Sequence, residues 1–494
     1  MTLQHALLAW FNIGDCLIFL LVFLLISYIL KNKTPPNFPP GPWSVPFLGN
    51  VFFGLDFRTI DKLAEEYGSV FSLRKGSEKI VVVSGYKMVK EALVTQGEHL
   101  ADRPVIPLFH EVFKGLGIIL SNGPMWKNQR RFANIHLKHF GEGKKALVTC
   151  ILGECHWLCQ AVKEEQGRPF DPQFIMNNAV ANVICSVMFG HRFDYSDTRF
   201  QTLLRLDAEA IFLFGTARAQ LYDVFPGLMK YLPGPHQTIF SHYAKIIAFL
   251  KEEIENHKKD WDPSDPRDYI DAYLGEIEAK KDDVEAGFNT ETLAFCTLDM
   301  FEAGTETAAT TLRWGFVFMM KYPEIQKKVH AEIDRVIGQS RQPTMADRAN
   351  MPYTDAVIHE IQRMSNIVPL GFPKMTSKDT MLGGHFIPKG TTVVTSLSSV
   401  LNDKNEWETP GTFNPGHFLD SQGKFQRRKA FLPFSAGTRV CLGEQLAQME
   451  LFLFFTSLLQ RFTIAPPPGV EPSLEGQLGF TYSPGSFLMC ALDR

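Results

Sequence analysis

Residues 434–443 read Phe-Ser-Ala-Gly-Thr-Arg-Val-Cys-Leu-Gly, and this stretch decides how the rest of the chain is interpreted. It places one cysteine, Cys441, between two glycines, Gly437 and Gly443. Glycine permits backbone conformations and close approaches that a side chain would block. The stretch therefore predicts a sharply bent loop that presents a single sulfur atom.

Two further residues of this loop indicate what the sulfur binds. A thiolate ligand to haem iron needs a cation for the haem carboxylates and an apolar screen against water. Arg439 offers a forked guanidinium that matches a carboxylate, and Phe434 can shield an iron–sulfur bond. A lone cysteine usually packs as a small hydrophobe, but this spacing favours Cys441 as an axial haem ligand.

The same decapeptide matches the pattern Phe-x-x-Gly-x-Arg-x-Cys-x-Gly, and in this it resembles the cytochrome P-450 family. The resemblance extends from the amino-terminal segment to the cysteine loop. It implies haem b as cofactor, with Cys441 as the metal ligand and with Phe434 and Gly437 at the cofactor. It also implies a mainly α fold with small peripheral β-sheets.

Composition sets broad limits on function. The chain has 494 residues, of which 45% are hydrophobic and 21% charged, with a formal net charge of -3. This is an ordinary globular balance that gives no support to nucleic-acid binding. Eight cysteines without paired spacing argue against a disulfide framework. No linker divides the chain after residue 50, so we expect one catalytic domain over residues 51–494.

The amino-terminal segment predicts a membrane anchor. Residues 7–30 are almost entirely apolar and, as a helix, would span a bilayer core of about 30 Å. No basic residue precedes them, whereas Lys31 and Lys33 follow directly, which argues against a cleaved signal peptide. The charge bias predicts an uncleaved, single-pass anchor over residues 1–33, with its amino terminus in the lumen and the catalytic domain in the cytosol.

Residues 34–50 begin with a proline-rich run, too rich in proline for helix or sheet. Such a run predicts a semi-rigid spacer between anchor and body. It also resembles the proline hinge of microsomal family members, which implies the endoplasmic reticulum membrane as the location.

Most of the body has helical periodicity. Short β-rich runs occur only at residues 70–73, 80–84 and 391–395. A long helix is predicted from Thr290, as a cap, to Lys321, because Pro323 ends it. This helix is apolar on nearly every side, which is typical of a helix in the centre of a large domain. We expect Gly304 to weaken its hydrogen-bond ladder locally.

The predicted central helix carries a possible proton relay. Thr307 lies one turn beyond Ala303, and Glu306 is its neighbour. A lone helical threonine usually bonds back to its own helix. The match of residues 303–307 to the family's Ala/Gly-Gly-x-Asp/Glu-Thr motif instead implies that Thr307 and Glu306 are catalytic and deliver protons for oxygen activation.

Further family positions follow from the resemblance. Glu360 and Arg363 match a Glu-x-x-Arg pair that acts as a structural lock near the haem, with His417 as its third partner. The alternative for this pair is an exposed ion pair of little energetic value. Lys374 stands where many relatives have histidine. The positions that match haem-propionate contacts are Arg103, Trp126, Arg130, Ser435 and Arg439.

Electron supply requires a partner. The chain has no dinucleotide fingerprint and no phosphate-binding Gly-Lys-Ser/Thr loop, and only 53 residues follow Cys441. We therefore expect NADPH–cytochrome P-450 reductase as partner, with cytochrome b5 as a further candidate. Basic residues near the haem motifs predict the docking surface, although a solvated charged face is the alternative; they are Lys127, Arg130, Arg131, Lys138, Lys424, Arg427, Arg428 and Lys429.

Within the family, the chain looks like a microsomal family-two member closest to the J subfamily of fatty-acid epoxygenases. The segments that carry this likeness are residues 225–226, 232–238, 268–274 and 351–353. The reaction implied is the insertion of one oxygen atom from O2 into a lipophilic substrate, and we expect epoxidation or hydroxylation of polyunsaturated fatty acids such as arachidonic acid. The candidate pocket residues are Phe109, Phe113, Ile118, Phe212, Phe301, Ala303, Val368, Leu370 and Phe480. Lys114 and Arg218 are the candidate anchors for a substrate carboxylate.

Three alternatives stay open. One is a monooxygenase of drugs or steroids with the same fold. Another is a reductase-independent haem-thiolate isomerase, which the intact Glu306–Thr307 pair disfavours because such an enzyme needs no proton relay. The last is a non-catalytic haem sensor or lipid carrier, which needs no complete oxygen-activating set.

Overall fold

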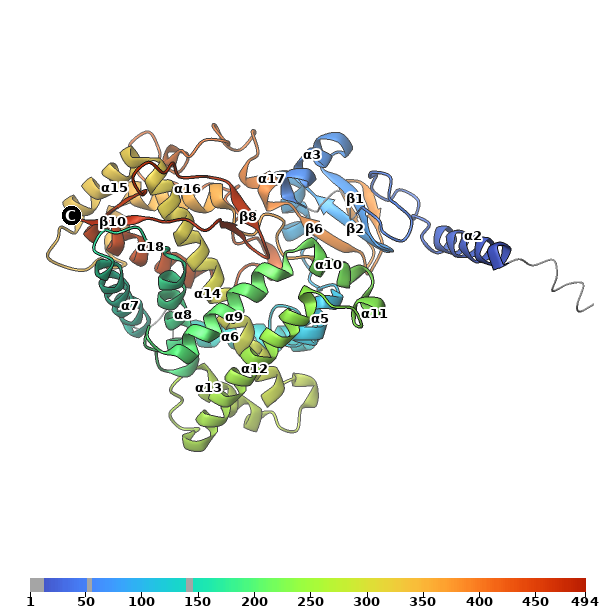
Figure 1. Ribbon diagram of the computed structural model, residues 1–494, viewed down its shortest axis with the longest axis horizontal. Helices are drawn as coiled ribbons and strands as arrows, with labels where there is room; N and C mark the ends of the chain where they lie inside the picture. Colours follow the sequence, from blue (N-terminus) through green and yellow to red (C-terminus); the bar gives the residue numbers. More distant parts are fainter. Residues whose placement is uncertain (1–12, 51–55, 139–144) are drawn as a thin grey trace, which may run out of the picture.

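The computed structural model describes residues 13–50, 56–138 and 145–494 and shows a mainly helical protein with small sheets, as predicted (Figure 1). Its helices are α2 (Ile13–Lys31), α3 (Phe57–Tyr67), α4 (Tyr86–Lys90), α5 (Pro107–Phe113), α6 (Gly123–Leu137), α7 (Lys145–Glu164), α8 (Gln173–Phe189), α9 (Thr198–Phe214), α10 (Ala217–Val224), α11 (Pro226–Met229), α12 (Pro235–Asp260), α13 (Tyr269–Ala279), α14 (Thr290–Lys321), α15 (Pro323–Val336), α16 (Pro352–Ser365), α17 (Leu397–Leu401) and α18 (Glu444–Arg461).

The strands are short. They are β1 (Val70–Lys75), β2 (Glu78–Val83), β3 (Lys374–Met375), β4 (Thr380–Leu382), β5 (His385–Ile387), β6 (Thr392–Thr395), β7 (Phe462–Ala465), β8 (Gly476–Leu478), β9 (Tyr482–Pro484) and β10 (Cys490–Asp493). Single-turn 3-10 or π segments are η2 (Glu91–Thr95), η4 (Val284–Ala286), η5 (Asp347–Asn350), η6 (Pro415–Phe418) and η7 (Gly437–Arg439).

One four-stranded sheet contains all three strand runs that the sequence predicts. Its order is β1-β2-β6-β3, in which β1 and β2 form an antiparallel hairpin and β2 and β6 run parallel. In this register Val81 faces Val393, and both are fully buried. Alternate valines therefore hold the sheet against α4 and α17, at the end of the body from which α2 extends (Figure 1).

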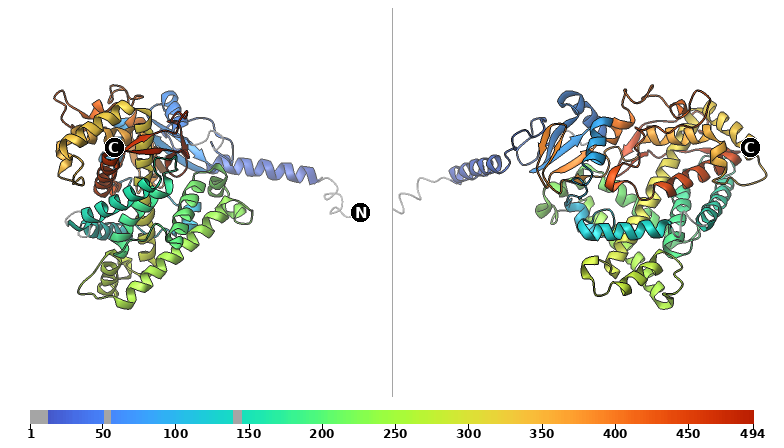
Figure 2. Two further views of the ribbon diagram at one scale, coloured as in Figure 1. Left: turned by 60° about the vertical axis from the view of Figure 1, so that its left-hand side comes forward. Right: turned by 180° about the vertical axis from the view of Figure 1, so that it is seen from behind.

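Helix α14 runs through the middle of the molecule, as Figure 2 shows from two sides. Its predicted bounds are confirmed, but its cap is different. The side chain of Asn289, not Thr290, accepts a hydrogen bond from the Thr292 N–H at 2.8 Å. Asparagine is a strong cap because its oxygen satisfies an amide that has no partner inside the helix.

Gly304 has a different role from the predicted one. Helix α14 continues unbroken through this position. A Cβ on Gly304 would lie 2.4 Å from two carbon atoms of Ile184, on α8. The glycine therefore allows α8 to pack closely on α14, rather than weakening the helix.

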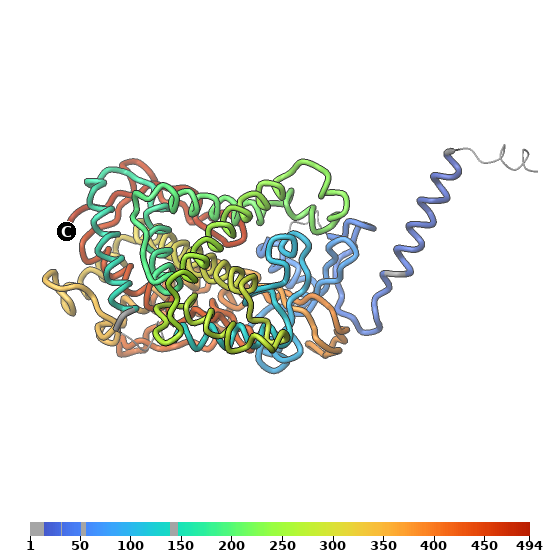
Figure 3. Tube along the Cα trace, turned by 90° about the horizontal axis from the view of Figure 1, so that it is seen from below, coloured from blue at the N-terminus to red at the C-terminus, as the bar shows by residue number. Residues whose placement is uncertain are grey.

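Helix α2 extends away from the body (Figures 1 and 3). Its large apolar side chains from Leu17 to Ile26, and then Ile29 and Leu30, are exposed. Among the residues that the structure describes, no helix is long and apolar enough to cross a membrane. The first part of the predicted span, residues 7–12, lies outside the described residues.

The proline-rich segment is bound to the body over part of its length. The Ser72 N–H donates to the Pro40 carbonyl at 2.7 Å, and the Phe386 N–H donates to the Asn37 carbonyl at 2.9 Å. A Cβ on Gly41 would lie 1.9 Å from the Ser72 carbonyl oxygen, so only glycine fits there. Part of the proline-rich segment therefore packs along β1 and β5 of the body.

Candidate functional site

The cysteine loop is fixed by its own backbone. The Cys441 N–H donates to the Phe434 carbonyl at 3.0 Å, which closes the loop, and Ser435 adopts a left-handed conformation with φ of 64°. Gly437 has φ of +73°, and its Cβ would lie 1.7 Å from the Leu93 carbonyl oxygen. Gly437 is therefore required by both its conformation and its contact with η2.

The second glycine of the motif behaves differently. Gly443 has φ of −89°, and a Cβ there would meet no atom of the described residues within 4 Å. The surrounding protein alone does not require glycine at this position. Its N–H hydrogen-bonds to the Cys441 sulfur.

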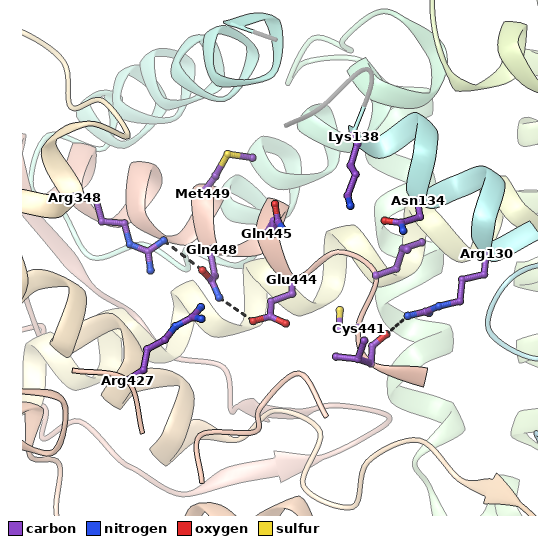
Figure 4. Close-up of a pocket in the computed structure, with 12 residues that line it drawn as sticks. Arg130, Asn134, Lys138, Arg348, Arg427, Cys441, Glu444, Gln445, Gln448 and Met449 are labelled. Carbon is purple, nitrogen blue, oxygen red and sulfur yellow. Dashed lines mark hydrogen bonds between the residues drawn. The ribbon is translucent and has the colours of Figure 1, made fainter. Parts of the chain in front are cut away.

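Cys441 is exposed and lines a concavity on the surface. Burial of the sulfur and the charge of Glu444 raise the pKa of this thiol, whereas the Gly443 N–H and the charge of Arg130 lower it. The Arg130 guanidinium also donates to the Val440 carbonyl at 2.6 Å, which joins α6 to the loop (Figure 4). Donors that favour the thiolate are thus in place around the sulfur.

Predicted propionate contacts meet in a buried cluster of cations. Arg103, Arg439 and Lys374 are all less than a tenth exposed. Backbone carbonyls, rather than carboxylates, satisfy the guanidinium groups. Arg103 donates to the carbonyls of Ile119, Phe372 and Pro373, and Arg439 donates to those of Ala101 and Ser121.

The charges in this cluster oppose one another. Burial, and then the charge of Arg130, lowers the pKa of Arg103 to about 9. Burial and the charges of Arg103 and Arg130 lower the pKa of Arg439 to about 8, against the opposing charge of Asp102. Burial, together with the charges of Arg103 and Arg439, lowers the pKa of Lys374 to about 7. A dianion placed here would relieve this repulsion.

Two polar atoms beside the cations lack a partner. The indole N–H of Trp126 and the hydroxyl of Ser435 are buried and have no hydrogen-bond partner among the described residues. The Arg439 guanidinium lies 3.7 Å above the Trp126 ring. Buried donors without partners are costly, so these atoms and the cations together fit the two carboxylates of a haem.

Sequence reasoning missed two residues that support this cluster. Asn122 accepts from the Arg103 N–H at 2.7 Å and from the Arg439 side chain at 3.2 Å. Asp299, on α14, accepts from the Ile118 N–H and, at 2.9 Å, from the Ile119 N–H. Asp299 was detectable as a carboxylate within an apolar helix, whereas nothing in the sequence distinguishes Asn122.

The predicted proton relay is arranged in two separate parts. Thr307 donates to the Ala303 carbonyl at 2.6 Å, which is the back-bonding expected of an ordinary helical threonine. Glu306 accepts from Thr310 at 3.0 Å and from Thr481 at 2.7 Å. Burial raises the pKa of Glu306, while these two hydroxyls lower it.

Several predicted pocket residues form an aromatic cluster. Phe109 lies 6.0 Å from Phe113 and 5.8 Å from Phe480, measured between ring centroids. Phe214 and Phe372, which were not predicted, also contact Phe109 at 4.4 and 6.2 Å. The cluster joins α5, the end of α9 and the β8–β9 turn.

Other predicted pocket residues lie apart from this cluster. Phe212 is 51% exposed, and Leu370 packs against the small core beneath β1. Phe301 is fully buried in the main core. Ile118 is buried and Val368 half-buried, whereas Ala303 is exposed. Aromatic sequence alone does not separate a pocket wall from core or surface.

Glu360 and Arg363 form the predicted ion pair, and it is fully buried. Two bonds of 2.8 Å join the carboxylate to the guanidinium. Arg363 also donates to the carbonyls of Leu401, Pro410 and Thr412. The alternative of an exposed pair is therefore wrong, and the pair ties α16 to the segment before η6.

His417 completes this lock. Its Nδ1 lies 3.2 Å from both Glu360 oxygens, while its Nε2 accepts from the Thr409 N–H at 3.2 Å. A ring nitrogen that accepts an amide proton carries no proton of its own. We therefore assign the neutral tautomer with the proton on Nδ1, which the sequence left open.

A basic concavity of about 670 Å³ lies on the cysteine side of the molecule (Figure 4). Arg130, Lys138 and Arg427, all predicted, line it together with Arg348 and Glu444. Arg428 instead forms an ion pair with Glu408 at 3.0 Å. The two predicted basic segments thus meet around Cys441, with Arg428 in a structural role.

A cysteine loop closed on itself, with buried cations and unpaired donors suited to two carboxylates, defines a haem-thiolate protein. The comparisons with known proteins agree: residues 39–491 match the Cytochrome P450 family model. The chain belongs to the cytochrome P450 family.

Three similar proteins indicate which members of the family this chain resembles. The chain is 50% identical over 476 residues to Cytochrome P450 2J2 of Homo sapiens, covering 96% of this chain and 94% of that protein. It is 49% identical to Cytochrome P450 2J1 of Oryctolagus cuniculus and to Cytochrome P450 2J3 of Rattus norvegicus, with the same coverage. The chain is thus a reductase-dependent haem monooxygenase that acts on lipophilic substrates.

Proposed function

We propose that the protein epoxidises long polyunsaturated fatty acids such as arachidonic acid. The observation that carries this proposal is the aromatic cluster around Phe109, in a chain about half identical to relatives of the 2J series. A wall of this kind suits a flexible hydrocarbon and offers few polar anchors. We therefore expect several regioisomeric epoxides rather than one.

Each part of the site has a role in this proposal. When bound, haem supplies the activation of dioxygen, which donation from a thiolate ligand favours. Arg103, Arg439 and the Trp126 N–H would hold the two propionates, and Phe434 would screen the sulfur from water. The orientation of the substrate and the delivery of protons are left to the protein.

Thr307 is the proposed proton donor next to the substrate. Its hydroxyl bonds to the Ala303 carbonyl at 2.6 Å and retains acceptor capacity for a water molecule. Glu306, held by Thr310 and Thr481, is the proposed reservoir behind it. Thr307→Ala should divert electrons into hydrogen peroxide, measured per NADPH consumed, whereas an unchanged ratio would leave Thr307 as helix packing.

The two candidate anchors for the fatty-acid carboxylate differ in their surroundings. Lys114, one candidate, is already paired with Glu291 at 2.8 Å. Arg218, the other, is exposed on α10. Arg218→Glu should therefore raise the KM for arachidonic acid more than Lys114→Glu does. Equal KM values in both variants and the parent would exclude both anchors.

Product analysis tests the function directly. The purified holoenzyme with reductase and NADPH should convert arachidonic acid into epoxides, and it should be inactive without reductase. No oxidation of any long-chain fatty acid, with rapid oxidation of drug-like molecules, would favour the xenobiotic alternative. Turnover of lipid peroxides without reductase would instead favour the isomerase.

We further propose that residues 1–33 anchor the protein in the endoplasmic reticulum membrane. The exposed apolar side chains of α2 support this, as do Phe212, Leu228 and Tyr231, which are 51%, 60% and 82% exposed near the end of α9 and at α11. Deleting residues 1–33 should leave a folded haem domain that still adheres to lipid vesicles. Full solubility without detergent or high salt would exclude the second contact.

The basic concavity is the proposed docking surface for the reductase, and for cytochrome b5. Arg130, Lys138, Arg348 and Arg427 gather around the cysteine side, through which electrons must enter. Complementary charge speeds encounter and makes it sensitive to salt. Arg428 is a poor choice for this test because its pair with Glu408 supports the fold.

A further inference from the structure

Helix α5 presents part of the proposed pocket wall, but its own sequence gives it no polar cap. It carries Phe109, the centre of the aromatic cluster. The residue at its N-cap position, Ile106, has an extended backbone and a side chain without a polar atom. Pro107 follows and has no N–H, so Leu108 carries the first amide of the helix that needs an acceptor.

The missing cap comes from another helix. Asp223, near the end of α10, accepts a hydrogen bond from the Leu108 N–H at 2.9 Å through Oδ1. Leu108 is the second residue of α5, and its amide is one of those that a capping side chain normally binds. A carboxylate at this position also suits the positive end of the helix dipole. Asp223 therefore caps α5 from a position 115 residues later in the chain.

The other oxygen of Asp223 binds the four-stranded sheet. Its Oδ2 lies 2.6 Å from the Nζ of Lys75, the last residue of β1. The two side chains are 6% and 17% exposed, so solvent screens this pair much less than a surface pair. One carboxylate thus joins α10, α5 and β1, which lie at the same end of the body (Figure 1).

A second hydrogen bond joins α5 to α10. The hydroxyl of Tyr222, the residue before Asp223, donates to Glu111 at 3.2 Å. Glu111 lies three residues after Leu108, so it is close to one helical turn further along α5. Two contacts spaced along the helix fix both its position and its rotation. Helix α5 is therefore held by α10 at two points.

The capped amide and the pocket ring belong to adjacent residues, Leu108 and Phe109. The Phe109 ring lies 4.4 Å from Phe214, at the end of α9, and 5.8 Å from Phe480, in the β8–β9 turn, measured between centroids. A displacement of the first turn of α5 must therefore move Phe109 relative to these two rings. Loss of the bond from Asp223 should change the shape of the pocket wall without changing its composition.

We propose that Asp223 is a positioning residue for the monooxygenase reaction. By capping α5 from α10 it fixes the ring of Phe109, and so influences which double bond of the substrate is oxidised. Asp223 acts through Phe109 and not on the reacting atoms. The inference rests on the proposed function in that Phe109 must line the substrate pocket.

The ion pair with Lys75 offers a different explanation for the same carboxylate, and two substitutions separate them. Asp223→Asn removes the charge but keeps an acceptor for the Leu108 N–H, and asparagine caps helices about as well as aspartate. Lys75→Met removes the ion pair alone. If the cap positions Phe109, both variants should resemble the parent enzyme, whereas Asp223→Ala should not.

The functional test measures the ratio of epoxide regioisomers from arachidonic acid, with holoenzyme, reductase and NADPH. Asp223→Ala should change this ratio about twofold or more, while total turnover at saturating substrate stays within about twofold of the parent. Adding Ile106→Asn to Asp223→Ala should restore the parent ratio, because asparagine at the N-cap position supplies the missing acceptor from within α5.

Hydrogen exchange in the substrate-free holoenzyme tests the cap itself. The amides of α5 should exchange about fivefold faster in Asp223→Ala and return to parent rates when Ile106→Asn is added. Asp197→Ala is the matched control, since Asp197 caps α9 by accepting from the Arg199 N–H at 2.8 Å. This control should speed exchange at the start of α9 and leave the regioisomer ratio unchanged.

Several results would overturn the inference. Unchanged exchange of α5 in Asp223→Ala would exclude the cap, and a parent ratio despite faster exchange would exclude the positioning role. Equal changes of the ratio in Asp197→Ala and Asp223→Ala would show general loosening of the fold.

A further variant decides if Asp223→Ala does not fold. Asp223→Glu keeps the charge beside Lys75 but displaces the acceptor from the Leu108 N–H, so it should also change the ratio, and a parent ratio would contradict the inference. A parent enzyme that forms no epoxides would refute the proposed function, whereas exchange in α5 would still show whether Asp223 caps this helix. The two can therefore fail independently.

Discussion

Two buried groups of charges near the cysteine loop differ in how they are satisfied. In the lock, Glu360 and Arg363 are fully buried, but the carboxylate neutralises the guanidinium. The remaining N–H groups of Arg363 donate to neighbouring backbone carbonyls. In the cation cluster, Arg103, Lys374 and Arg439 are also deeply buried, yet they repel one another. A buried group whose opposite charges pair with each other serves the fold, whereas a buried group of like charges without a counter-charge indicates an anionic ligand.

The largest effect is expected when the cation of the buried Glu360–Arg363 pair is removed. Arg363→Ala leaves Glu360 as a buried charge without its cation, which costs about 3–5 kcal/mol. This is a large part of the stability of a typical domain. We expect the variant to unfold at much lower denaturant concentration or to accumulate without haem.

A matched control uses an exposed pair with the same spacing and the same order of charges. Lys258 lies 2.8 Å from Glu255 on α12, and both residues are exposed. Exposed pairs contribute about 0–1 kcal/mol, so Lys258→Ala should unfold near the parent midpoint. Equal losses in Arg363→Ala and Lys258→Ala would contradict the lock.

Substitution in the cation cluster should change the rate of haem loss more than the stability of the fold. Arg439→Leu removes a propionate contact but also relieves repulsion of Arg103 and Lys374. We expect haem to dissociate at least tenfold faster into an apo-globin scavenger, with a smaller loss of stability than in Arg363→Ala. Arg131→Leu, at an exposed position on α6, is the control. Unchanged haem loss in Arg439→Leu would exclude the propionate role.

The same cluster predicts how haem affinity depends on pH. Without a counter-anion the pKa of Lys374 is about 7, far below its usual value of 10.5. Haem propionates favour the charged amine and raise this pKa, so haem binding takes up a proton above pH 7. Haem affinity should therefore fall as pH rises from 7 towards 10. Lys374→Met should make this dependence shallower without abolishing it, because Arg439 and Arg103 also have lowered pKa values and remain beside the propionates. An equal slope in both proteins would contradict the role of Lys374.

The smallest effect is expected at the basic concavity, on the rate at which the reductase delivers electrons. Arg427 lines the concavity and is exposed, so its reversal should disturb electron delivery and not the fold. Arg427→Glu should slow reductase-driven turnover a few-fold at low salt, with peroxide-driven turnover unchanged and the difference shrinking as salt rises. Equal loss in both assays would give Arg427 a structural role.

Local sequence was sufficient where one short segment holds the whole feature. The cysteine loop, the central helix and the Glu360–Arg363 pair each depend on residues within a few turns of one another. Their bounds and contacts are therefore close to the predictions. The role of Gly437 also follows from the loop, although its contact with Leu93 required the structure.

Features that depend on distant segments were not predictable in this way. Asn122 accepts a hydrogen bond from the side chain of Arg439, which lies 317 residues later in the chain, and nothing in the sequence around Asn122 distinguishes it. The prediction that Gly304 weakens its helix was wrong. The residue that requires a glycine there, Ile184, belongs to another helix, so the local sequence does not reveal the contact. The neutral tautomer of His417 depends on Thr409, which no motif includes.

The carbon-monoxide difference spectrum of the reduced protein tests the central claim, that Cys441 is the thiolate ligand of a haem. The parent protein should show the strongly red-shifted band of a thiolate-bound haem. Cys441→Ser should abolish it while some haem remains bound through the propionate contacts, because an alcohol is a poor anionic donor to iron. Survival of the red-shifted band in Cys441→Ser would contradict the account.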